Sequence, residues 1–102
     1  MAYKVNIYAK AELEFLQTIE FLLENWSVVR ANKFARIFQK LQVALSLNPY
    51  QYLYYDRKLN IHCAPITRHN MVYYQIDERS KVVVVLTVFN VFQNPEKFKI
   101  GM

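Results

Sequence analysis

Residues 82–86 form an unbroken apolar run, Val-Val-Val-Val-Leu, within the segment SKVVVVLTVF. β-Branched residues favour an extended strand, and a strand with one face in water alternates apolar and polar side chains. This run has no polar side, so it predicts a strand that is covered on both faces. The question that it raises is what covers the second face.

The chain is short for two layers of cover. We expect its 102 residues to form one domain, 1–102, with one core, since 54% are hydrophobic, one is glycine and no linker-like run interrupts them. No signal pattern opens the sequence, and no helical segment is apolar enough to span a bilayer, so we expect a cytoplasmic protein. Cys63 is the sole cysteine, which excludes an internal disulfide.

Periodicity predicts a first strand over residues 3–8 and two helices after it. In the first helix, about 10–26, one face gathers Phe15, Leu16, Ile19, Leu22, Leu23 and Trp26, whereas Phe21 falls on the polar side. In the second helix, 27–47, a buried stripe gathers Ala31, Phe34, Phe38, Leu41 and Leu45. Ser27 is the predicted N-cap and Asn48-Pro49 the stop. The helices must fold back as an antiparallel hairpin because almost nothing joins them.

Three further strands follow the helices. Residues 50–60 are expected to form a loop or short strand that carries Arg57 and Lys58. The segments IHCAPIT and NMVYYQI and the valine run then form a three-stranded antiparallel meander. Segregated helices and strands predict an α+β fold, in which the helix hairpin packs on one face of an antiparallel sheet.

The other face of that sheet needs a cover. Leaving it bare would forgo on the order of 1.5 to 3 kcal/mol for each large side chain. The candidate partner-binding residues are Val83, Val85, Phe89 and Phe92. The cover could be the chain's own tail, a second copy in a homodimer, or a different protein, and we favour the different protein because monomers rarely expose such a patch.

Charge narrows the class of partner. Thirteen Lys plus Arg against eight Asp plus Glu give a formal charge of +5, which favours nucleic acid or an acidic protein. Lys33, Arg36 and Lys40 lie opposite the buried stripe of the second helix, as either a solvated face or a partner-binding one. His62, Cys63 and His69 lack paired ligand spacing, so we expect no metal, and we expect no cofactor.

Four segments carry a resemblance to a known family. They are AELEFLQTIEFLLENWS, ANKFARIFQKLQVALSLNP, ITRHNMVYYQIDERSKVVVVLTVFN and QNPEKF. In these segments and in the predicted order of its elements, the chain resembles the RelE/ParE superfamily of bacterial toxins. The resemblance extends from about residue 5 to residue 98. The resemblance implies the toxin of a type II toxin–antitoxin module, which an antitoxin encoded by an adjacent gene wraps and neutralises. Antitoxin would then be the missing cover.

The superfamily has two branches. RelE-like members enter the ribosome and cut messenger RNA with a cluster of Arg and Lys, often with a Tyr or His near the carboxyl terminus, whereas ParE-like members bind and poison DNA gyrase. Here Met71 stands where the nuclease branch tends to place arginine, residues 90–93 replace expected basic residues, and Phe98 lies about where a tyrosine would be. Since a phenyl ring transfers no proton, we expect a ParE-like inhibitor that acts by binding.

Two alternatives stay open. A metal-independent, RelE-like endoribonuclease acting on mRNA in the ribosome would draw its catalytic residues from Arg68, His69 and Tyr73. Its target or nucleic-acid contacts would come from Arg57, Lys58, Lys97 and Lys99. The other alternative is a non-toxic interaction module on the same fold.

Overall fold

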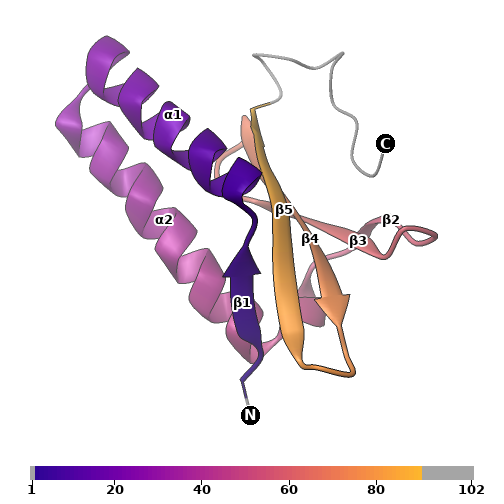
Figure 1. Ribbon diagram of the computed structural model, residues 1–102. Helices are drawn as coiled ribbons and strands as arrows, with labels where there is room; N and C mark the ends of the chain where they lie inside the picture. Colours follow the sequence, from indigo (N-terminus) through magenta and orange to yellow (C-terminus); the bar gives the residue numbers. More distant parts are fainter. Residues whose placement is uncertain (1, 91–102) are drawn as a thin grey trace.

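The computed structural model describes residues 2–90. The elements are β1 (Lys4–Ile7), α1 (Ala9–Asn25), α2 (Val28–Leu47), the 3₁₀ helix η1 (Pro49–Gln51), β2 (Tyr54–Asp56), β3 (Ile61–Pro65), β4 (Asn70–Asp77) and β5 (Val82–Asn90). Both helices lie on the same side of the sheet and form an antiparallel hairpin (Figure 1). The predicted α+β class is therefore confirmed.

The five strands form one mixed sheet in the order β1-β5-β4-β3-β2. β3, β4 and β5 make the predicted antiparallel meander, and β2 adds a short antiparallel edge. β1 pairs in parallel with β5, with Val5 opposite Val83, so the expectation of a purely antiparallel sheet is wrong. Local periodicity identifies an extended segment but says nothing about the direction of its neighbour.

Helix α2 forms as its sequence predicts. The hydroxyl of Ser27 accepts a hydrogen bond from the backbone N–H of Arg30 at 3.1 Å, which satisfies one of the free donors of the first turn. At the other end, the side chain of Asn48 caps η1, which Pro49 begins. The buried residues of the helix are those predicted: Ala31, Phe34, Phe38, Leu41 and Leu45.

Helix α1 is covered less fully than its sequence predicts. The Phe15 ring packs between those of Phe34 and Phe38, with centroid distances of 5.7 and 4.8 Å. Three residues expected on the buried face, Leu16, Leu23 and Trp26, are 54%, 49% and 59% exposed. This part of the prediction is wrong. The hairpin diverges from the sheet toward its tip (Figure 1), which leaves Leu23 and Trp26 uncovered by the other described residues, whereas Leu16 lines an open pocket on the flank of the hairpin.

The valine run has two different faces. Val83 and Val85 are fully buried, together with Val88, against the helices and the inward residues of β4. Val82, Val84 and Leu86 lie on the opposite face and are half-buried. The placement of Val83 and Val85 on a partner-facing surface is therefore wrong: the register with β1 and β4 turns these two residues into the core.

A bulge keeps β5 in phase with the core over its whole length. Tyr73 pairs with Thr87 while Tyr74 pairs with Val85, so Leu86 is the extra residue on β5. Val72 then pairs with Val88, and both are buried. The bulge therefore lets Val83, Val85 and Val88 lie on one continuous face against the helices.

Beyond β1, the edge of β5 is capped by a side chain from α1. Glu14 Oε1 accepts hydrogen bonds from the Thr87 hydroxyl at 2.6 Å and from the Val88 backbone N–H at 3.0 Å. Lys10 donates to the other carboxylate oxygen of Glu14 at 2.7 Å. The carboxylate thus occupies an edge position that another strand would otherwise fill.

A second polar cluster fixes the turn between β4 and β5. Glu78 Oε1 accepts hydrogen bonds from the hydroxyls of Tyr3 at 2.8 Å and Tyr50 at 2.5 Å, and Lys81 donates to the other oxygen. These bonds to Lys81 and to the two tyrosines hold the pKa of Glu78 down at about 2. The carboxylate thereby ties the turn to η1 and to the residue before β1.

Candidate target and partner surfaces

Arg57 and Lys58 lie on the exposed turn between β2 and β3. The Arg57 guanidinium sits over the Tyr54 ring, 4.6 Å from its centroid, and the turn is closed by a hydrogen bond from the Leu59 N–H to Asp56 Oδ1. The arginine is therefore held against β2, at the start of β3.

Arg68 and His69 lie on the turn that follows β3. The Thr67 hydroxyl oxygen organises this turn, since it accepts from the backbone N–H groups of His69 and Asn70 and from the Asn70 side chain, at 2.9 to 3.2 Å. β3 has five residues and is roughly 16 Å long. The two basic pairs therefore stand at opposite ends of one strand, and the sheet does not bring them together.

Tyr73 lies near the middle of β4, on the face away from the helices, opposite Cys63 of β3. Its ring meets that of Tyr55 edge to face at 5.0 Å. Burial raises the pKa of the Tyr73 hydroxyl and of the Cys63 thiol, and the two side chains also hydrogen-bond. Both groups are therefore neutral near pH 7, and neither is poised as a base or nucleophile.

The side chains of the three residues considered as metal ligands do not converge on one point. His62 is buried, with Nδ1 2.9 Å from the Tyr52 carbonyl oxygen and its ring 5.2 Å from that of Tyr74. Cys63 is the next residue and points to the other face of the strand, whereas His69 lies on the turn beyond. Within residues 2–90, no group of three or more His, Cys, Asp or Glu side chains could hold a metal ion.

The sheet face turned away from the helices is mostly apolar. Half-buried side chains on it include Val82, Val84, Leu86, Met71 and Cys63. Phe89, a predicted partner-binding residue, is half-buried near the end of β5. The other predicted sites Phe92, Lys97 and Lys99 lie outside the described residues.

A large hollow lies at the tip of the helix hairpin, and we call it the helix-end groove. It has a volume of about 820 Å³ and lies between the two helices, the turn after β3 and the end of β5. It is lined by Thr18, Phe21, Leu22, Trp26, Val29, Arg30, Lys33, Phe34, Ile37, Thr67, His69, Asn70 and Asn90. Phe21, an apolar residue on the polar face of α1, is one of the residues that line this groove.

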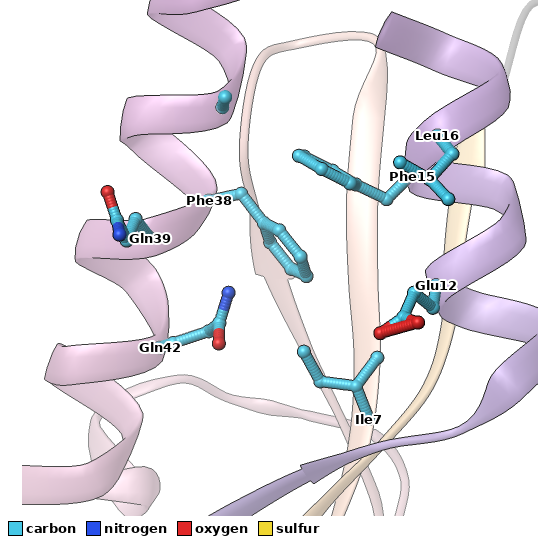
Figure 2. A pocket seen from close by; sticks show the side chains of 8 residues that line it. Ile7, Glu12, Phe15, Leu16, Phe38, Gln39 and Gln42 are labelled. Carbon is cyan, nitrogen blue, oxygen red and sulfur yellow. The ribbon is translucent and has the colours of Figure 1, made fainter.

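A smaller pocket of about 430 Å³ opens on the other flank of the hairpin, and Figure 2 shows it. The rings of Phe15 and Phe38 and the side chain of Ile7 point into it, with Gln39 and Glu12 at its rim (Figure 2). Its one charged lining residue is acidic, so it suits a different ligand from the groove. Sequence periodicity had indicated neither cavity, because each is formed where packing between elements is incomplete.

Comparison with solved structures finds other chains with a similar fold. The chain is similar to one in the toxin–antitoxin complex RelBE2 from Mycobacterium tuberculosis, with a TM-score of 0.64 at 18% identity over 88% of this chain and 99% of that one. It is also similar to one in the heterotetrameric YoeB–YefM toxin–antitoxin complex from Staphylococcus aureus, with a TM-score of 0.54 at 9% identity over 84% and 93%. The chain shares their fold.

These structures agree with the fold that the resemblance to the RelE/ParE superfamily implies. No protein-family model matches the sequence, and no curated protein matches it. Neither helix in the described part of the chain is long and apolar enough to cross a membrane.

Proposed function

We propose that this chain is the toxin of a type II toxin–antitoxin module and that a cognate antitoxin neutralises it. The observation that carries the proposal is the fold shared with chains of two toxin–antitoxin complexes over at least 84% of this chain and at least 93% of theirs. The apolar sheet face and the helix-end groove add support, because a stable monomer rarely leaves such surfaces without a partner.

Within that class, we propose that the chain inhibits its target by binding, as ParE-like toxins inhibit DNA gyrase. RNA cleavage needs a base, an acid and cations within hydrogen-bond reach of one phosphodiester. Here Arg57 and Arg68 stand at opposite ends of β3, and the Tyr73 hydroxyl is buried and neutral. This layout favours a binding surface over a catalytic centre.

The second candidate is the RelE-like endoribonuclease. The observation that favours it is the identity of the structural neighbours, which are RelBE2 and YoeB–YefM complexes. In that case the adjacent pair Arg68 and His69, on one turn, would be the centre of the chemistry.

Expression of the chain alone in bacteria tests the class of function. We expect growth to stop, and we expect co-expression of the short reading frame beside its gene to restore it. Growth that continues while the folded chain accumulates would instead support the non-toxic interaction module.

Two reconstituted reactions distinguish the targets. We expect the purified chain to stop DNA supercoiling by gyrase and to leave messenger RNA on translating ribosomes intact. The opposite result, with RNA cleavage abolished by Arg68→Ala or His69→Ala, would establish the nuclease. Circular dichroism of each variant must first show an unchanged fold.

A further inference from the structure

The helix-end groove combines an apolar floor with a positive rim. Phe21, Trp26 and Val29 are 41%, 59% and 75% exposed, although each is a side chain that folding normally buries. Arg30 and Lys33 stand beside them on α2, and none of the lining residues is acidic. The Arg30 guanidinium lies over the Trp26 ring, 4.3 Å from its centroid, so charge and apolar surface are continuous.

One residue that lines the same groove, Asn70, carries a buried polar atom. Asn70 is 8% exposed, and its side-chain nitrogen donates to the Thr67 hydroxyl, but its Oδ1 is buried and has no hydrogen-bond partner among the described residues. A buried acceptor without a donor is unfavourable by about 1 to 3 kcal/mol. The groove is therefore bordered by a residue whose polar side chain is not fully satisfied.

The charge of the groove selects among the occupants. In a symmetric contact between two copies, Arg30 and Lys33 of one would face the same cations of the other. The side chains of residues 91–102 include Lys97 and Lys99 against one acid, Glu96, so they do not supply the excess of negative charge that the rim calls for. A separate acidic chain is the occupant whose charge complements the rim.

We propose that the helix-end groove binds an acidic amphipathic helix and that the antitoxin supplies it. This inference rests on the proposed function for the identity of the partner, whereas its chemistry follows from the groove. Apolar side chains spaced by three or four residues would pack on Phe21, Trp26 and Val29, and acidic side chains beside them would face Arg30 and Lys33.

Trp26 is the sole tryptophan of the chain, so its fluorescence reports directly on the groove. The probe is a synthetic tryptophan-free helical peptide with a leucine stripe and glutamates on either side of it. We expect this peptide to shift the Trp26 emission to the blue with saturable binding. A peptide of the same composition with the stripe scrambled should bind on the order of tenfold more weakly or worse.

Charge reversal on α2 provides a matched pair of variants. Arg30→Glu with Lys33→Glu should weaken binding of the acidic peptide on the order of tenfold. Arg36→Glu with Lys40→Glu makes the same change at exposed positions outside the groove. Because salt screens charges that do not touch the peptide, this control should leave the peptide affinity within about twofold of the wild-type value. Equal losses in the two double variants, or no blue shift with the wild-type chain, would overturn the proposal.

Other occupants give their own signals in the full-length chain. A blue shift of Trp26 that grows with protein concentration alone would place a second copy in the groove. A red shift caused by Phe98→Asp would place the chain's own end there. Either result overturns the proposal. Growth arrest is measured separately. Arrest without peptide binding would overturn the groove proposal and leave the toxin proposal standing. Peptide binding without arrest would support the groove proposal and contradict the toxin proposal.

Discussion

Two neighbouring valines of β5 should respond to the same substitution by very different amounts. Val83 is fully buried between Val5 of β1 and Ile76 of β4, whereas Val84 is half-buried on the opposite face. Threonine has nearly the shape and strand propensity of valine, so Val83→Thr and Val84→Thr differ mainly in where they place a hydroxyl group.

The magnitudes follow from that placement. A hydroxyl buried without a hydrogen-bond partner destabilises a protein by about 1 to 3 kcal/mol, whereas a substitution on a surface that water reaches usually stays within about 0.5 kcal/mol. At about 4 °C per kcal/mol for a domain of this size, Val83→Thr should lower the melting temperature by about 4 to 12 °C. Val84→Thr should lower it by about 2 °C or less.

Urea and thermal unfolding followed by circular dichroism measure both values. Val82→Thr is the control, because Val82 shares the face of Val84 and should behave like it. A loss of stability from Val84→Thr equal to that from Val83→Thr would refute the register of β5 and, with it, the assignment of the outward face.

Substitutions at three further positions test individual side chains. Tyr74→Phe removes the buried hydrogen bond from the Tyr74 hydroxyl to the Pro49 carbonyl, 2.6 Å long, and should lower the free energy of unfolding by about 1 to 2 kcal/mol in urea titrations. Ser27→Ala removes the cap of α2 and should lower it by about 1 kcal/mol, while Ser27→Asp should retain most of it. The pKa of Glu78 is about 2 in the fold against an ordinary 4.5, so its stabilising effect is present above pH 4.5 and is lost as the pH falls toward 2. Glu78→Gln should therefore flatten the melting temperature across that range, and high salt should shrink the difference because the group is exposed. An unchanged pH profile would contradict the role of Glu78.

An element's buried face could be predicted where apolar and polar residues are clearly separated in the sequence. In helix α2 the buried apolar residues recur at intervals of three and four, so its stripe, cap and end followed from the residues alone. β5 offers five consecutive apolar residues, and no local rule states which of them turn inward. Pairing with β1 and the bulge at Leu86 settle that question, and both depend on contacts distant in sequence.

The candidate site was predictable only in parts. Residues such as Arg57 and Arg68 were picked out by type, but their separation depends on the length and direction of β3. The groove escaped prediction because Trp26 and Phe21 carry the same apolar signal whether a helix buries them or leaves them exposed. Exposure at the hairpin tip follows from the angle between hairpin and sheet, which only tertiary packing sets.

Counts of viable cells after induced expression test most directly whether this protein is a toxin that a partner neutralises. The comparison uses the wild-type chain, the wild-type chain with the adjacent reading frame, and Tyr74→Asp, which places a charge in the core and should unfold the protein. We predict that colonies are lost only with the wild-type chain alone. Colony numbers that stay the same in all three cultures, with soluble folded wild-type protein present, would contradict the proposed function.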